Sequence, residues 1–358
     1  YRRLESGSHL FLSAPRRSGK TSIMRFLEDN PRDRFMFLYI TVEDVTDCED
    51  YFRILSEELL KSEAIGKLAK LNEKAKSRLT AFIEHFKKIK ILNVEIETNQ
   101  PEKAKYSEEF ETLLRELDTD GAVVCIMVDE FPVTLEAIAK TKGPEEAVRF
   151  LRINRSLRQK AKPGIQFIYT GSIGLPNIAR KLDATSTIND LSVVEIPPLS
   201  LEEGLDMSRR IFDYYRVQVP DDTIHYMLEK IEWLMPFFVQ LVVQMVIDEA
   251  ELNGSKPVKK ELIDEVLLKA SNHRNNIYFE NYFSRLDKTL PPEESRTARE
   301  ILGEIAAKGQ MPAGAFAHAN APGVLEILEF DGYIHLDEQK IYRFNSPILR
   351  MWWEKFAR

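Results

Sequence analysis

The chain is 358 residues long, 44% of them hydrophobic and 30% charged, and its formal net charge is -7 at pH 7. This length allows two or three domains with a sizeable buried core, and the composition is ordinary for a globular protein. The acidic excess argues against a broadly basic protein that coats nucleic acid, although it leaves room for a local basic patch.

Three further classes of protein are disfavoured. The most apolar window, Trp233 to Ile247, is shorter than the roughly 20 residues that a membrane helix needs, and it contains Gln240 and Gln244, so it predicts a buried helix. The six histidines show no spacing typical of a structural metal site. The two cysteines, Cys48 and Cys125, provide no disulfide framework, which favours a reducing, cytoplasmic setting.

In chain order, the first informative stretch is SAPRRSGKTS at residues 13–22. Its residues Gly19, Lys20 and Thr21 fit the end of the pattern G-x-x-x-x-G-K-[ST]. In such a loop the backbone N–H groups surround phosphates, the lysine contacts the β and γ oxygens, and the hydroxyl binds Mg²⁺. A helix is predicted at Ile23 to Leu27, and its positive N-terminal end would face the anion.

One position departs from the pattern, because Ala14 stands where the first glycine is expected. Alanine disfavours positive φ, so the loop entrance must adopt ordinary backbone angles or be strained. By itself the match could be an accidental turn, but the order strand, loop, helix favours a phosphate-binding loop. The expected nucleotide contacts are Ala14, Pro15, Arg16, Arg17, Ser18, Gly19, Lys20, Thr21 and Ser22.

Continuous apolar runs alternate with amphipathic segments over the first 198 residues. Such runs predict strands covered on both faces. The predicted strands are Leu10–Leu12, Phe35–Val42, Ala122–Val128, Ile165–Tyr169 and Val193–Ile196, with Ile89–Ile96 as an added strand. Helices are predicted at Tyr51–Leu60, over residues 61 to about 90 as a solvated pair, at Ser107–Leu117 and at Ala147–Gln159. This alternation implies an α/β fold with a parallel sheet and helices on both faces.

Two acids, Asp129 and Glu130, directly follow the strand Ala122–Val128. This is the Walker B arrangement, in which Asp129 would hold the Mg²⁺ shell and Glu130 would polarise the attacking water. The alternative is a strand that simply ends at the surface, and the phosphate loop makes the catalytic interpretation the favoured one. An acid pair combined with an extra strand favours the P-loop NTPases that use an additional catalytic glutamate.

Polar residues after the strand Ile165–Tyr169 add a further candidate. Thr170 or Ser172 could hydrogen-bond the γ-phosphate or its water, as a sensor of hydrolysis requires. The predicted helix Ala147–Gln159 carries a row of arginines that could serve a partner subunit, a γ-phosphate or solvent, with a solvated basic face favoured. The candidates for an arginine finger are Arg16, Arg17, Arg152, Arg155 and Arg158.

From Leu199 the composition becomes helical. Four helices are predicted as a lid at Ser200–Tyr215, Thr223–Ile231, Pro236–Leu252 and Lys259–Ala270. Later segments predict a winged helix: helices at Glu294–Ala307 and Gly323–Phe330, and strands at Gly332–Leu336 and Lys340–Phe344. Its recognition segment, Ala313–Phe330, contains no Lys or Arg, so protein docking or autoinhibition is favoured over DNA readout.

Five phrases carry a resemblance over nearly the whole chain: SAPRRSGKTS, VVCIMVDEFP, FIYTGSIG, VEIPPLSLEEGL and YRFNSPILRMWW. With these, the chain resembles the prokaryotic STAND-type or archaeal ATPase family, relatives of the AAA+ and Orc1/Cdc6-like ATPases. The resemblance implies a P-loop core of the additional-catalytic-glutamate type at residues 1–198, with a helical insertion at about 61–118. A helical lid at 199–271 and a winged-helix module at 272–358 would follow.

The resemblance also implies ATP and Mg²⁺ as cofactors, and a role for each site residue. Lys20 would contact the β and γ phosphates, Thr21 and Asp129 would bind Mg²⁺, and Glu130 would be the base, with Ser172 or Thr170 as sensor. Family members often carry Gly-x-Pro in the lid, whose proline approaches the nucleotide; here Pro236 stands in that place without the glycine. The segment that usually contacts adenine would precede Tyr1, so ATP over GTP rests on the likeness.

We therefore expect a slow, cytoplasmic, Mg²⁺-dependent ATPase that acts as a nucleotide-controlled switch in signalling or defence. A protein partner, or self-association through the lid and winged helix, is expected. The main alternative is an ATP-dependent DNA-binding protein of the initiator or transposition-regulator type. A nucleotide-binding scaffold with vestigial hydrolysis is a third possibility.

Overall fold

The computed structural model describes the chain except residues 64, 67, 69–72, 96–104, 253, 255–257, 273–275, 317–318 and 358. The described residues divide into two compact units. The first comprises residues 1–13 and 20–196, and the second comprises residues 14–19 and 197–358. No helix formed by the described residues is both long and apolar enough to cross a membrane.

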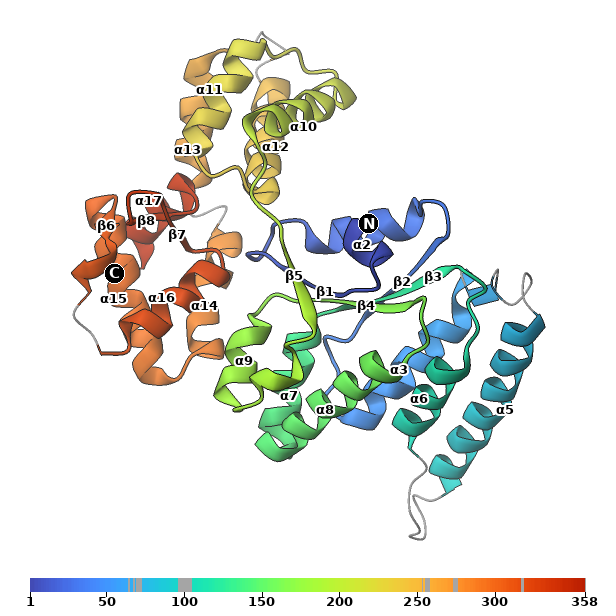
Figure 1. Cartoon of the computed structure of the whole chain (residues 1–358). Helices are drawn as coiled ribbons and strands as arrows, with labels where there is room; N and C mark the ends of the chain where they lie inside the picture. Colours follow the sequence, from blue (N-terminus) through green and yellow to red (C-terminus); the bar gives the residue numbers. More distant parts are fainter. Residues whose placement is uncertain are drawn as a thin grey trace. The chain divides into compact units, whose positions relative to one another are not determined.

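A parallel sheet forms the centre of the first unit. Within the described residues it has five strands, in the order β2-β3-β4-β1-β5 (Figure 1). The strands are β1 (His9–Ser13), β2 (Phe35–Thr41), β3 (Val123–Asp129), β4 (Ile165–Thr170) and β5 (Leu191–Glu195). All four neighbouring pairs are parallel, so every strand ends at the same edge. The predicted parallel α/β core is confirmed, and β4 lies between β1 and β3.

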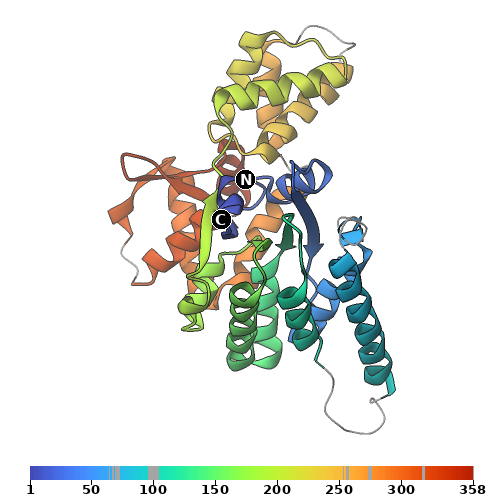
Figure 2. The same cartoon turned by 45° about the vertical axis from the view of Figure 1, so that its right-hand side comes forward.

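Helices cover both faces of this sheet, and α5 packs on α6. The helices of the unit are α1 (Arg2–Glu5), α2 (Lys20–Asp29), α3 (Cys48–Lys61), α5 (Glu73–Glu95), α6 (Tyr106–Glu116), α7 (Phe131–Lys142), α8 (Pro144–Lys160) and α9 (Leu175–Lys181). Leu4 of α1 and Met24 of α2 pack on one face. Tyr51 of α3 and Phe131 of α7 pack with Tyr169 of β4 on the other. Figures 1 and 2 show α2 on one side of the sheet and α3, α6, α7 and α8 on the other.

The prediction of an added strand at Ile89–Ile96 is wrong. Residues up to Glu95 belong to α5, which begins at Glu73, and Ile96 lies outside the described residues. Extending an existing helix costs far less free energy than nucleating a new element, because each added residue gains one hydrogen bond. The helical segment that precedes this β-branched run therefore determines its conformation.

The arginine row of α8 makes structural contacts within the first unit. Arg149 forms an ion pair with Glu146, and Arg155 donates to the carbonyl of Ser186. Arg158, whose side chain is only 2% exposed, donates two hydrogen bonds to the carboxylate of Asp190. Burial of such a cation requires a well-aligned partner, which this bidentate pair provides. Arg149 and Arg152 are exposed, as the interpretation of a solvated basic face expects, whereas Arg155 and Arg158 are bound by other residues of the unit.

The second unit contains the four predicted lid helices: α10 (Leu201–Tyr214), α11 (Asp221–Ile231), α12 (Pro236–Leu252) and α13 (Lys260–Ala270). The remaining helices are α14 (Asn276–Thr289), α15 (Pro292–Lys308), α16 (Ala321–Phe330) and α17 (Pro347–Phe356). A small antiparallel sheet joins β6 (Met311–Pro312), β8 (Ile341–Phe344) and β7 (Ile334–Leu336) in that order. The predicted helical region and winged-helix-like end are confirmed.

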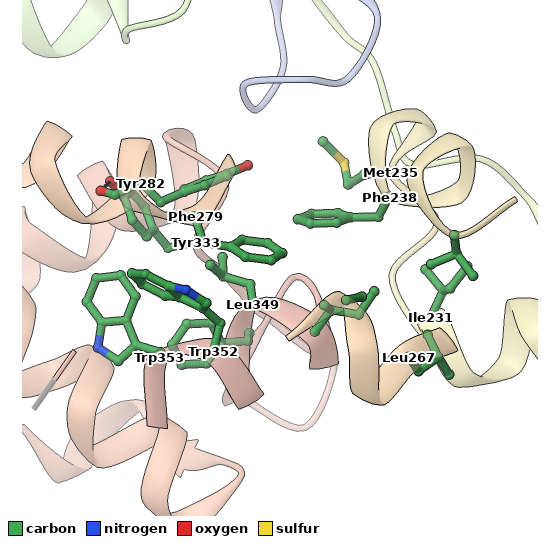
Figure 3. Packing of buried hydrophobic residues seen from close by; sticks show 14 of the residues in the cluster. Ile231, Met235, Phe238, Leu267, Phe279, Tyr282, Tyr333, Leu349, Trp352 and Trp353 are labelled. Atoms are coloured by element: carbon green, nitrogen blue, oxygen red, sulfur yellow. Dashed lines mark hydrogen bonds between the residues drawn. The ribbon is translucent and has the colours of Figure 1, made fainter. Parts of the chain in front are cut away.

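One hydrophobic cluster runs through the whole second unit. It includes Phe238 of α12 and Leu267 of α13, together with Phe279 of α14 and Trp352 of α17 (Figure 3). The apolar window that begins at Trp233 falls largely in α12, which is a buried helix as predicted. Lid and winged helix therefore share a core, and a boundary between them at residues 271 and 272 stays a prediction.

Candidate functional site

The phosphate-loop sequence joins the end of β1 to the start of α2. Gly19 has φ of +87°, a conformation that glycine adopts without strain. Arg17 also has a positive φ, +67°, which is uncommon for a residue with a side chain. Ala14 is buried and is absent from the positive-φ residues, so alanine fits where the pattern has glycine. Of the two predicted outcomes for the loop entrance, ordinary backbone angles are the one observed.

The helix α2 begins at Lys20, three residues before the predicted start at Ile23, and places Thr21 at the carboxyl edge of the sheet. The Thr21 hydroxyl donates to Oδ2 of Asp129, the last residue of β3, at 2.8 Å. Asp129 is buried, whereas Thr21 is exposed. A hydroxyl and a carboxylate are oxygen ligands of the kind that Mg²⁺ prefers, and Mg²⁺ usually completes its shell with water and substrate phosphate. These residues fit a magnesium site.

Tyr39 of β2 belongs to this site, although sequence reasoning missed it. Its hydroxyl donates to the same Oδ2 of Asp129 at 2.9 Å. The guanidinium carbon of Arg25 lies 3.7 Å from the centroid of the Tyr39 ring. The backbone N–H of Tyr39 donates to the carboxylate of Glu28. Burial and the neighbouring Asp129 carboxylate raise the pKa of the Tyr39 phenol, so it remains a proton donor.

Glu130 follows β3 directly and has φ of 60°, in the left-handed region, at the start of α7. Its Oε2 accepts two hydrogen bonds from Ser172: one from the backbone N–H at 2.8 Å and one from the hydroxyl at 2.9 Å. A Cβ on Gly171 would lie 2.5 Å from Cδ of Pro132 and 3.4 Å from the same Oε2. The missing side chain at Gly171 is what lets β4 approach the carboxylate so closely.

The two sensor candidates occupy different places. The Thr170 hydroxyl donates to the carbonyl of Leu12 at 3.3 Å, and Thr170 is fully buried. It therefore links β4 to β1. Ser172, two residues further on, contacts Glu130 instead. Of the two sensor candidates, Ser172 therefore contacts the predicted catalytic glutamate, and Thr170 does not.

The other predicted contacts are distributed over both units. Lys20 is buried at the first position of α2, and Ser22 is exposed on the same helix. Ser18 is buried, and its hydroxyl has no hydrogen-bond partner among the described residues. Within the second unit, Pro236 lies beside the loop, since a Cβ on Gly19 would be 4.0 Å from Cγ of Pro236.

Comparisons with known proteins agree with this architecture. No protein-family model matches the chain, and no curated protein matches it in sequence. Among solved structures, the chain is similar to a Walker-type ATPase of Pyrococcus abyssi, with a TM-score of 0.60 and 18% identity, over 98% of this chain and 93% of that one. The chain therefore shares the fold of that structure: a parallel P-loop-like sheet, a helical region after it and a small winged-helix-like end.

A second solved structure has a similar fold. It is the Orc2 protein of Aeropyrum pernix in its ADPNP–ADP complexes, with a TM-score of 0.54 and 12% identity, covering 98% of this chain and 88% of that one. Likeness at such identity concerns the fold alone. In this chain, the loop after β1, the acids after β3 and Ser172 after β4 all follow neighbouring strands.

Proposed function

We propose that the chain binds Mg²⁺-ATP, hydrolyses it slowly, and uses the nucleotide state as a switch. The observation that carries the proposal is the pairing at the sheet edge. A phosphate-loop hydroxyl contacts Asp129, and the adjacent Glu130 is held by Ser172. The P-loop ATPase fold and the ADPNP–ADP complexes of the Orc2 structure support the choice of nucleotide.

Each residue has a distinct part in this proposal. The N–H groups of the loop and the Lys20 ammonium would bind the phosphate oxygens and neutralise their charge. Thr21 and Asp129 would hold Mg²⁺, which supplies charge stabilisation to the transferred phosphoryl group. Tyr39 would fix the orientation of the Asp129 carboxylate, because it donates to one of its two oxygens.

Glu130 would orient the attacking water and accept its proton. Both donors of Ser172 contact Oε2, so among the described contacts Oε1 is the oxygen left for water. A carboxylate whose rotation is restricted in this way is preorganised for general-base catalysis. Its left-handed backbone conformation is a further mark of a constrained site.

Phosphate release from Mg²⁺-ATP tests this proposal, with binding measured separately by calorimetry. We expect continuing turnover by the wild type, and a loss of at least about 100-fold in Glu130→Gln with ATP binding retained. Lys20→Ala should lose both. Glu145→Gln, at an exposed position of α8, is the matched control and should behave as wild type. Turnover that survives Lys20→Ala would count decisively against the proposal, and a GTP series would test the choice of base.

The switch part of the proposal requires different affinities of two conformations for ATP and ADP, rather than fast turnover. The second unit, with its helical and winged parts, would then present a surface to a protein partner or a second copy. A role in signalling or defence would fit the family that the sequence resembles. The DNA-binding alternative has less support, because α16 carries Glu326 and Glu329 and no basic residue.

A further inference from the structure

Two arginines of the phosphate loop contact helices of the second unit, to which residues 14–19 belong. The Arg17 guanidinium carbon lies 3.9 Å from the ring centroid of Phe237 and 5.4 Å from that of Tyr282. The neighbouring Arg16 donates to Oδ1 of Asn281 at 3.3 Å. Cations at such distances from aromatic faces are attracted by the ring quadrupole. The loop is therefore held by residues from both α12 and α14.

A third contact comes from the turn between α16 and β7. A Cβ on Gly332 would lie 3.2 Å from Cβ of Pro15, and 3.6 Å from the carbonyl oxygen of Arg16. Gly332 also has φ of +82°. Close approach of this turn to the loop backbone thus depends on glycine.

These contacts surround a residue in an unfavourable conformation. The positive φ of Arg17 costs free energy that glycine at this position would not incur, and such a conformation persists only where its surroundings stabilise it. Where successive residues alternate between right-handed and left-handed backbone conformations, their N–H groups point toward the same concave side. Backbone loops bind phosphate in this way. The conformation of Arg17 therefore bears on anion binding by the loop.

We propose that Phe237 and Tyr282 are positioning residues for the phosphate loop. By stacking on Arg17 they hold the left-handed backbone in which the loop N–H groups surround the triphosphate. Nucleotide affinity and the packing of the second unit are then coupled, and the coupling is reciprocal. This inference rests on the proposed nucleotide binding, and it adds the residues through which the second unit takes part.

The same contact leads into the core of the second unit. Tyr282 packs edge-on against Tyr333 with 5.2 Å between ring centroids, and Tyr333 packs against Trp353 at 6.1 Å (Figure 3). The Tyr333 hydroxyl also donates to the carbonyl of Tyr282 at 2.6 Å. The three tryptophans of the chain, Trp233, Trp352 and Trp353, all belong to this unit. Their emission can therefore report how the second unit responds to nucleotide.

A double-mutant cycle tests the proposal through the dissociation constant of Mg²⁺-ATP, measured by calorimetry. Phe237→Leu removes the aromatic face, and we expect its Kd to rise about fivefold, which corresponds to about 1 kcal/mol. Glycine adopts a positive φ without stabilising contacts, so the Kd of Arg17→Gly should stay within about twofold of the wild-type Kd. Adding Phe237→Leu to Arg17→Gly should then change nothing further.

Matched variants separate positioning from general damage. Phe237→Tyr keeps the ring and should restore the wild-type Kd, whereas Tyr214→Leu removes an exposed aromatic of the same unit and should leave it unchanged. If Phe237→Leu does not fold, Arg17→Ala can be used in its place. Alanine neither stacks on Phe237 nor adopts a positive φ as readily as glycine does, so the Kd of Arg17→Ala should rise.

Tryptophan emission gives a readout independent of turnover. Mg²⁺-ATP should shift the emission of wild type, and the shift should be lost in Arg17→Gly although calorimetry still detects binding. Equal Kd values for Phe237→Leu and wild type would overturn this inference and leave the proposed function standing. A fivefold rise in Kd on adding Phe237→Leu to Arg17→Gly would do the same. A wild type that binds no nucleotide would overturn the proposed function, and this inference with it.

Discussion

At the scale of single residues, one oxygen of Asp129 accepts two hydroxyl donors, from Thr21 and Tyr39. In the proposed magnesium site, Thr21 would turn its hydroxyl hydrogen away from Asp129 so that its oxygen could face the ion. Tyr39 would keep its hydrogen bond through this change. We therefore expect the tyrosine to orient the Asp129 carboxylate with and without the ion.

Replacing Tyr39 by Phe should weaken Mg²⁺ binding without abolishing it. Loss of an outer hydrogen bond to a metal ligand typically costs 10- to 100-fold in affinity, so we expect the Mg²⁺ concentration for half-maximal ATP binding to rise about tenfold. The titration should be run beside Tyr214→Phe, which changes an exposed tyrosine. An unchanged Mg²⁺ requirement would show that Tyr39 serves only to pack β2.

The residues of the candidate site differ in whether the sequence alone can identify them. Lys20, Thr21, Asp129 and Glu130 could be predicted because each stands at a fixed offset from a local pattern. Tyr39 could not, since its role depends on β2 pairing with β3 in the register that puts Thr41 opposite Asp129. That register is a property of the folded sheet, and no short motif encodes it.

At the scale of elements, the approach of β4 to the start of α7 is limited by Gly171. A side chain there would meet Pro132, a ring that cannot rotate out of the way. We expect Gly171→Ala to lower the free energy of unfolding by about 1–3 kcal/mol. It should also slow phosphate release, because Glu130 and Ser172 would be pushed apart.

Gly303→Ala is the control for this substitution. Gly303 lies within α15, where a Cβ would meet nothing within 4 Å, so alanine should stabilise the helix by about 0.5–1 kcal/mol. Urea unfolding and phosphate release measured on both variants compare the two glycines. Equal stability of Gly171→Ala and wild type would mean that the two elements can separate without cost.

Long apolar strands and strongly patterned helices were predictable, and the error and omissions have physical causes. Strands β3 and β4 are buried along their whole length, as their apolar runs predicted, whereas the edge strand β5 is only partly buried and is not covered on both faces. Residues 89–95 include β-branched side chains that favour a strand, but they are helical because they continue α5. The helix α17 went unpredicted because its aromatic residues, including Trp352 and Trp353, belong to a core assembled from distant segments.

At the scale of the whole molecule, the winged-helix-like fold raises the question of DNA. The segment 313–330, which includes α16, has no Lys or Arg, and Glu326 lies exposed on the helix. We expect no shift of duplex DNA in a gel at low salt. Binding whose log affinity falls linearly with log salt would contradict this and revive the initiator-like alternative.

The thiols of Cys48 and Cys125 are both buried, and burial raises the pKa of each to about 12. At neutral pH neither is a thiolate, the form that reacts with maleimides. The native cysteines can therefore remain when fluorophores are attached to new surface cysteines, for example at Glu84 in the first unit and Tyr214 in the second. Energy transfer between two such dyes, measured with and without Mg²⁺-ATP, would test the proposed switch in a chain that keeps both native cysteines.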